Sequence, residues 1–357
     1  MEKLIGECML CKRDMKVSNT TFGKGCERNI YEILNIPYSR EIKDKEEYLY
    51  AYIMKKTGAI GLNREQQQIL VNRYLANVYL EQIPYGNIEK YKKQLNEDIL
   101  VLKYGENLKL KTVNKISLNE IYYIYKKTKK FTASLDKLSK MNWKEEATEK
   151  FIIANFSFIF HLTENSSQFQ KNIYKGMQFA FWQVVIEVGG RYAEYKTSAY
   201  LLQNSLKKYP KNLNITNGPI IDEIKQDNNF MIYINKLLSQ HKNEKNFYVD
   251  KDNNEETNKF SFSTGDLYFG IHGLETFKVS GEKDSDNKRI LKIEMKDTYD
   301  YTNPKKLDEY YNDTENVPKS LLSSTLYNMA SKSVKDGVIK PFIIYLFFDL
   351  NEDEVKQ

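Results

Sequence analysis

The chain has 357 residues, of which 41% are hydrophobic and 29% charged, so a folded core is expected and global disorder is excluded. The formal net charge of +6 comes from 54 basic and 48 acidic residues spread along the whole length, without the concentrated basic stripe that marks nucleic-acid binders. The longest apolar run, residues 151–162, is too short to span a bilayer and is typical of a buried core helix.

The first residues, Met1–Lys16, lack the apolar core of a secretory signal peptide. We therefore expect synthesis in the cytoplasm without a signal peptide. Action outside the cell then requires lysis or a dedicated export machine.

Helical periodicity dominates the chain to about residue 240. Ser117 and Glu120 have the spacing of a capping box and predict a helix start. The sequence predicts a helical domain over residues 31–150 and an apolar helical region over residues 151–245. Within the first, apolar residues recur at the spacing of one helix face: Ile69, Leu70, Tyr74, Leu75, Val78 and Tyr79.

The period changes to two after a polar stretch at residues 239–259, which is interpreted as a linker or long loop. Residues 282–288 indicate a hairpin turn, and the apolar residues 340–350 indicate a central strand. We therefore predict an α+β fold, with helices followed over residues 255–352 by an antiparallel β-sheet or half-open β-barrel of about five to seven strands.

All three cysteines, Cys8, Cys11 and Cys26, lie within residues 1–30, and an odd, clustered set argues against a disulfide framework. A Cys-x2-Cys turn brings two thiolates close enough to share one tetrahedral Zn²⁺, and the glycine-bearing stretch before Cys26 suits a third ligand. We predict a zinc-knuckle-like segment with a structural zinc; the alternative is three reduced cysteines without metal. The fourth ligand is left open between an Asp or Glu, a group of a partner and one of the histidines His161, His241 and His272.

The strand that begins at Leu291 ends in an acidic and aromatic cluster. Leu291, Ile293 and Met295 share one face, and two-residue alternation places Asp297 and Tyr299 on that same face. A carboxylate is costly to desolvate, so Asp297 is expected to be paired, metal-bound or open to a cleft. The plain alternative is a strand that ends in a turn, where Asp is common.

The order of elements over roughly residues 195–350 resembles the activity domain of colicin M. That resemblance implies Mg²⁺-dependent phosphoester cleavage of lipid II, the undecaprenyl-linked peptidoglycan precursor. It implies that Asp300 is the central catalytic carboxylate and magnesium ligand, with Asp297 and Tyr299 in support and Asp266 as a binding residue. The positions that carry the resemblance are Gly265, Asp266, Gly281, Asp297, Tyr299, Asp300 and Tyr301.

The family follows its aspartate with a His-Arg pair, and those positions fall here at Lys306 and Leu307. The expected substitutes are His272, as a catalytic residue on the neighbouring strand, or Lys305 and Lys306, as binding residues. Otherwise the chemistry differs or the domain acts without catalysis.

Three functional hypotheses follow. The resemblance implies an antibacterial toxin (a bacteriocin) that acts at the envelope of target bacteria, with lipid II or the target membrane as its partner and an immunity protein as its antidote. The second is a non-enzymatic pore-forming bacteriocin that inserts residues 151–162 and 176–190 as a helical hairpin. The third is an intracellular phage or plasmid accessory protein whose zinc knuckle binds nucleic acid or a partner, although the charge pattern disfavours nucleic acid.

Overall fold

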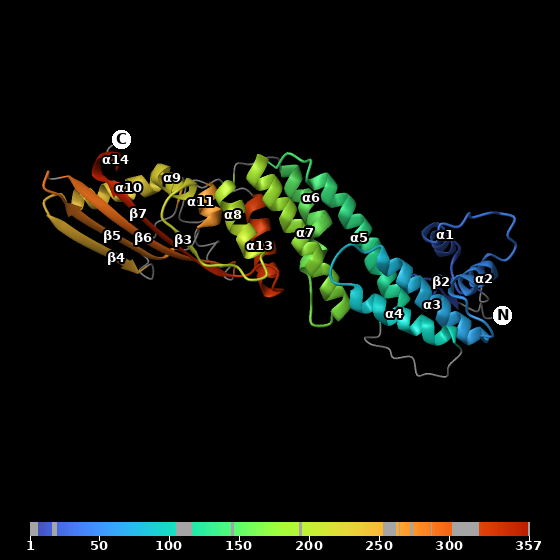
Figure 1. The fold of residues 1–357 in the computed structure, drawn as a ribbon. Coiled ribbons are helices and arrows are strands. Elements are labelled where there is room, and N and C mark those ends of the chain that lie inside the picture. Colours follow the sequence, from blue (N-terminus) through green and yellow to red (C-terminus); the bar gives the residue numbers. More distant parts are fainter. Residues whose placement is uncertain are drawn as a thin grey trace. The chain divides into compact units, whose positions relative to one another are not determined.

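The computed structural model describes residues 6–15, 20–104, 116–143, 146–192, 195–252, 262–263, 265–271, 274–286, 288–301 and 321–355. The fold is α+β, as predicted, with helices through most of the chain and a five-stranded sheet formed mainly by its C-terminal part (Figure 1). Two compact units are present, one made of Met1–Ser134 with Thr163–Met177 and the other of Leu135–Leu162 with Gln178–Gln357. The predicted division into four regions stays a prediction.

The first unit holds a small antiparallel hairpin, in which Gly6 pairs with Met15, followed by helices. Leu70, Leu75 and Tyr79 of the predicted helix face are buried, and the other members of that face are half-buried. The elements are β1 (Gly6–Glu7), β2 (Asp14–Met15), α1 (Lys24–Ile33), α2 (Lys45–Thr57), α3 (Arg64–Glu81), α4 (Glu89–Lys103) and the first parts of α5 (Leu118–Leu138) and α7 (Gln168–Tyr192).

Helices α2 and α3 of this unit begin at side chains that cap them from the adjacent sequence, Asp44 and Asn63. The amide of Gln66 donates to Asn63 Oδ1 at 2.9 Å and the amide of Asn63 donates to Gln66 Oε1 at 3.0 Å, which forms a complete capping box at the start of α3. At the predicted box only one half forms: the Glu120 amide donates to Ser117 Oγ at 3.4 Å. The Glu120 carboxylate instead accepts a bond from Ser167 Oγ.

The second unit contains the long apolar run as a core element. Within the run 151–162, residues 151–160 form the end of α6 and the 3-10 helix η1, and Ile152, Phe156 and Ile159 are completely buried. Among the described residues, no helix combines the length and the apolarity needed to cross a membrane. The helical elements of this unit, besides the second parts of α5 and α7, are α6 (Glu146–Phe156), η1 (Ser157–Phe160), α8 (Lys196–Ser205), α9 (Pro219–Gln226), α10 (Asn228–Gln240), α11 (Gly265–Gly270), α13 (Leu321–Lys335) and α14 (Glu352–Val355).

The sheet has the strand order β3-β7-β6-β5-β4, and α9 and α10 lie along one of its faces (Figure 1). The final strand is central, as predicted, and the predicted turn at 282–288 joins β5 to β6. Phe230 and Tyr233 of α10 contact the sheet through Phe348 and Phe277, with ring centroids 6.0 Å and 5.4 Å apart. The strands are β3 (Leu213–Ile215), β4 (Asn246–Asp252), β5 (Leu274–Lys283), β6 (Arg289–Tyr299) and β7 (Phe342–Asn351).

Three local predictions are corrected. In the expected linker at 239–259, the described residues 239–252 instead hold the end of α10 and strand β4, whose polar residues suit an edge strand paired with β5; residues 253–259 lie outside the described part. Residues 265–270 are helical because Leu267 and Ile271, four residues apart, are both buried. The sheet is not wholly antiparallel, since β3 pairs in parallel with β7.

Candidate functional site

The hairpin β1–β2 holds the first two cysteines in a tight turn. The amide of Cys8 donates to the Arg13 carbonyl at 3.0 Å, and the amide of Lys12 donates to the Cys8 carbonyl at 2.9 Å. Lys12 has φ of 62°, the left-handed conformation that lets the chain reverse directly after Cys11. This local geometry brings the two halves of the Cys-x2-Cys motif together.

The third cysteine comes from the first turn of α1, which begins directly after Gly23. The Gly23 amide donates to Cys8 Sγ at 3.3 Å and so ties the start of the helix to the hairpin. The sulfur atoms of Cys8, Cys11 and Cys26 all lie within 4.8 Å of one another. Among the described residues, these cysteines are the ligand-type side chains that gather in a group of three or more.

Three thiolates bound to one zinc ion are separated by about 3.8 Å when each Zn–S bond is about 2.3 Å. Separations of up to 4.8 Å therefore need sulfur movements of about 1 Å or less to enclose one ion, which side-chain rotation supplies. The donor set and its spacing fit a metal ion.

The electrostatics of the triad also favour a cation. Burial raises the pKa of Cys8, but backbone amides, above all that of Gly23, outweigh burial and leave this pKa below its usual value. Burial, the side chain of Cys11 and the charge of Cys8 raise the pKa of Cys26. Loss of the proton from one thiol therefore disfavours its loss from the next, and a bound metal ion would favour the deprotonated form of all three.

Phenol groups line the side of the triad near α3 and α5. Burial and the neighbouring Cys26 and Cys11 thiols raise the pKa of Tyr122 to about 12, so its hydroxyl keeps its proton beside Cys26. Tyr79 packs edge-on against Tyr122 at 5.2 Å and donates to Asn29 Oδ1 at 2.6 Å. A protonated phenol stabilises a thiolate by donating to it.

The described histidines do not join the cysteines. His161 and His241 belong to the second compact unit, and neither is part of the ligand group. The ring of His241 contacts Glu244 at 2.9 Å and stacks on Phe247 at 4.6 Å. His272 lies outside the described residues, as do Lys305 and Lys306.

The alternation predicted for β6 is present in the structure. Leu291, Ile293 and Met295 are buried, and the same face continues with Asp297 at 1% exposure and Tyr299 at 0%. Asp300 follows the last strand residue and is partly exposed. Asp297 and Asp300 thus occupy different surroundings, one buried and one partly exposed.

A β-bulge lies beside Asp297. The register of β5 and β6 shifts between Leu274 and Thr276, so that Glu275 is the extra residue. Its carboxylate contacts Lys296 Nζ at 2.5 Å and accepts from Thr298 Oγ1 at 2.5 Å. These contacts tie the bulge of β5 to the end of β6.

Tyr299 and Tyr301 form a pair in which Tyr299 is buried and Tyr301 is partly exposed. Their hydroxyl groups, on Tyr299 and Tyr301, lie 2.8 Å apart, and the Tyr299 ring stacks on Phe342 at 5.0 Å. Burial, then Tyr301, and more weakly Asp297 and Asp266, raise the pKa of Tyr299 well above its usual value. Tyr299 is therefore a neutral, packed residue that anchors the strand end.

Asp266 serves the start of α8. Its two carboxylate oxygens accept the amides of Thr197 and Ser198, each at 2.7 Å, and its carbonyl accepts from Ser198 Oγ at 2.6 Å. These amides belong to the first turn of the helix and have no partner within it. Asp266 therefore caps α8 from a distant part of the chain.

Asp227 and Arg289 are buried charged residues that were not among the sequence candidates. Asp227 caps α10 through the Phe230 amide at 3.0 Å and also accepts the Ser263 amide at 2.7 Å. Arg289 starts the buried face of β6 and donates to the Glu244 carbonyl at 2.5 Å. Sequence signals for both residues were present. The two-residue alternation that located Asp297 also places Arg289 on the inward face. Asp227 lies directly before a helix, where an acid commonly caps.

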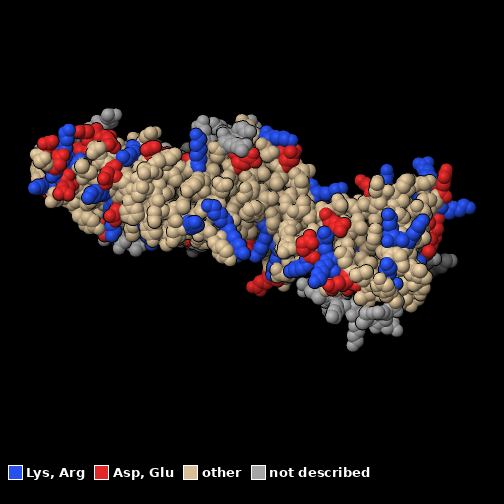
Figure 2. Space-filling model, viewed as in Figure 1, with Lys and Arg blue, Asp and Glu red and all other residues tan. Residues whose placement is uncertain are grey.

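On the face shown in Figure 2, basic and acidic side chains are interspersed both over helices α1–α4 and over the sheet. This mixture agrees with the even spread of charge along the sequence.

Comparison of the chain with known protein families, with characterised proteins and with solved structures gave no match. The function is therefore inferred from the geometry of the cysteine triad and of the end of β6.

Proposed function

We propose that Cys8, Cys11 and Cys26 bind one Zn²⁺ ion that stabilises the N-terminal part of the helical unit. The convergence of three sulfurs within 4.8 Å carries this proposal. Thiolates are preferred zinc ligands, and zinc has no redox chemistry that would oxidise them. When bound, the ion supplies a fixed link between the β1–β2 hairpin and α1.

The role is structural rather than catalytic. Cys8 is completely buried, and the Gly23 amide at 3.3 Å from its sulfur is a donor of the kind that orients metal ligands. A short hairpin of two-residue strands cannot hold its turn by backbone bonds alone. Metal binding therefore supplies the stability that these few hydrogen bonds do not.

Native mass spectrometry tests this proposal. The full chain, refolded with one equivalent of Zn²⁺, should gain the mass of one ion. Cys26→Ser should not gain it, whereas Met9→Leu, a substitution in the same turn that removes no thiol, should bind as the wild type does. A wild type that stays metal-free under these conditions would refute the site.

For the C-terminal unit we propose a second function, that of an antibacterial toxin acting at the envelope of target bacteria after release from the producing cell. Its activity would be Mg²⁺-dependent hydrolysis of lipid II, as the likeness to colicin M implies. The partly exposed carboxylate of Asp300, next to a strand end held by Tyr299 and Tyr301, favours this function. Mg²⁺ is often bound by one or two carboxylates together with substrate phosphates and water, so a single acid from this strand suits such a site.

The residues at the end of β6 would have different roles in this reaction. Asp300 would hold the ion, which neutralises charge that develops on the phosphate. The buried Tyr299 and the bulge at Glu275 orient the strand end from which Asp300 projects. Asp297 supports the same end from the buried face.

Incubation of the purified chain with lipid II and Mg²⁺ tests the second function. Release of the phosphorylated head group should be abolished by Asp300→Asn and retained by Asp349→Asn, which changes an exposed acid on β7 of the same sheet. Equal release by both variants would contradict the role of Asp300. Dye leakage from lipid vesicles without head-group release would instead support the pore-forming alternative, and retention of nucleic acid would support the accessory-protein alternative.

A further inference from the structure

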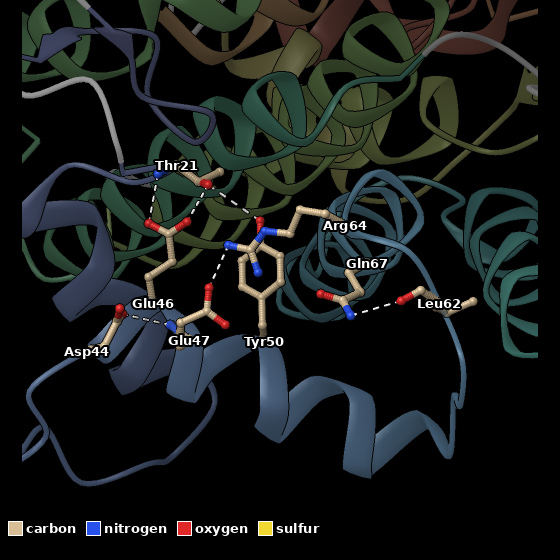
Figure 3. A network of polar contacts seen from close by, with 8 residues as sticks. All are labelled: Thr21, Asp44, Glu46, Glu47, Tyr50, Leu62, Arg64 and Gln67. Carbon is tan, nitrogen blue, oxygen red and sulfur yellow. Dashed lines mark hydrogen bonds and ion pairs between the residues drawn. The ribbon is translucent and has the colours of Figure 1, made fainter.

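Glu46, in the first turn of α2, is hydrogen-bonded to Thr21, in the segment that lies between the second and third cysteines (Figure 3). Its Oε2 accepts the backbone amide of Thr21 at 2.7 Å, and its Oε1 accepts the hydroxyl of the same residue. The Thr21 hydroxyl also lies 3.4 Å from the hydroxyl of Tyr50. Both oxygens of one carboxylate are thus used on a single loop residue, an arrangement stronger than two neutral hydrogen bonds.

Thr21 is also hydrogen-bonded to the β1–β2 turn, which carries Cys8 and Cys11. The carbonyl of Thr21 accepts the amide of Met9, which lies between Cys8 and Cys11, at 3.0 Å. Two residues later the Gly23 amide donates to Cys8 Sγ, and α1 then begins and delivers Cys26. The position of Thr21 therefore fixes the distance between the hairpin ligands and the helix ligand.

The neighbouring acid on α2, Glu47, contacts α3 and not Thr21. Glu47 forms an ion pair with Arg64 at 2.8 Å, while the Arg64 guanidinium lies over the Tyr50 ring at 4.2 Å (Figure 3). That pair joins α2 to α3 and reaches Thr21 only indirectly, through the Tyr50 ring on which Arg64 lies. Glu46 and Glu47 both lie in the first helical turn, so their interactions with the helix dipole are similar and cancel when the two are compared.

We infer that Glu46 is a positioning residue of the metal site, which it serves by holding Thr21 and thereby the spacing of the three cysteines. This inference rests on the proposed zinc site. It couples metal binding to the packing of α2, so the knuckle is built into the helical unit instead of being an independent finger.

Zinc affinity of the full chain, measured by competition with a chromophoric chelator, tests the inference on Glu46→Ala and Glu47→Ala. Loss of ligand-orienting contacts typically weakens metal binding about 10–100-fold, and we expect about tenfold for Glu46→Ala. Glu47→Ala should match the wild type. The absorption spectrum of bound Co²⁺ should also change in Glu46→Ala alone, because a merely structural role would lower the unfolding temperature without altering the ligand geometry of the folded protein.

Equal zinc affinities in Glu46→Ala and Glu47→Ala would overturn the inference, while failure of the wild type to bind zinc would overturn the proposed zinc site itself. If Glu46→Ala does not fold, Thr21→Val tests the inference instead, since it removes the hydroxyl that donates to Glu46 and keeps the backbone amide. Weaker zinc binding by Thr21→Val than by Thr20→Val, a change at the exposed neighbour, supports the role of Glu46, and equal binding contradicts it.

Discussion

The cysteine turn and the end of β6 both gather chemically active side chains, yet they use them in opposite ways. In the first region, two sulfurs of the β1–β2 turn and one of α1 lie close together, and backbone amides and Glu46 position the segments that carry them. At the end of β6, Asp297 and Tyr299 are buried, and the nearby Asp266 is committed to backbone amides of α8. Convergence supports the metal site proposed for the first region, whereas burial and helix capping give most residues of the second region a structural role.

This contrast isolates Asp300 within the second region. Asp300 is partly exposed, while Asp297, on the same strand end, is 1% exposed. Substitutions at the end of β6 should therefore separate into those that lower stability and one that changes chemistry alone.

The largest effect on stability is expected from Leu291→Ala. Leu291 is completely buried on the inward face of β6, so its truncation leaves a cavity and should lower the free energy of unfolding by about 2–5 kcal/mol. Chemical denaturation measures the change, and Lys292→Ala, at the exposed neighbouring position, serves as the control with a change within about 0.5 kcal/mol. Similar values for both would mean that β6 does not carry the core.

A smaller loss is expected from Asp266→Ala. The variant removes the two acceptors that cap α8, and a lost cap costs about 0.5–2 kcal/mol. Thermal unfolding should show this loss, with Asp286→Ala in the exposed β5–β6 turn as a control that leaves stability unchanged. A fully stable Asp266→Ala that lacks toxin activity would instead return Asp266 to the binding role that the sequence predicts.

Alkaline pH should weaken the second unit through Tyr299. Burial raises its folded-state pKa well above the value of about 10 in the unfolded chain. Above pH 10 the unfolded state releases this proton and the folded state keeps it, so the free energy of unfolding falls by up to about 1.4 kcal/mol per pH unit. The loss begins near the unfolded-state pKa and ends once the pH passes the folded-state pKa.

Urea unfolding at a series of pH values measures this slope in Tyr299→Phe. The variant should show a shallower decline between pH 10 and pH 11 than the wild type. Tyr248→Phe is the matched control, because it removes the same hydroxyl from a side chain that is 61% exposed. An unchanged slope in Tyr299→Phe would show that its hydroxyl is not buried in solution.

The smallest effect on stability is expected from Asp300→Ala. A partly exposed carboxylate after the last strand residue contributes little to the core, so the free energy of unfolding should change by less than about 0.5 kcal/mol. Killing of target cells, in contrast, should be lost. A stable variant that kills as the wild type does would remove the enzymatic proposal for this unit.

Local patterns were enough to predict much of this structure. Two-residue alternation from Leu291 to Tyr299 identified the buried face of β6, and the clustered cysteines predicted the three sulfur-bearing side chains that lie close enough together to hold a metal ion. Both signals depend on residues close together in the chain, where geometry follows from spacing. The α+β class followed from the same change of period.

The remaining features depend on contacts between distant residues. Helix α11 was expected to be a strand, because an alternating run as short as residues 265–270 suits either state and its capping role involves Thr197, 69 residues earlier. Strand β3 has three residues and is defined by its pairing with β7. Glu46 looked like any acid in a first helical turn, since its partner Thr21 lies 25 residues away.

The central claim, that three converging cysteines form one zinc site, is tested most directly by alkylation of the native protein combined with zinc analysis. Purified wild type should contain one zinc ion per chain, and Cys8, Cys11 and Cys26 should all resist alkylation until a chelator removes that ion. Stoichiometric loss of zinc should then coincide with the labelling of all three thiols. Zinc-free protein whose three thiols are labelled at once, without any chelator, would contradict the account.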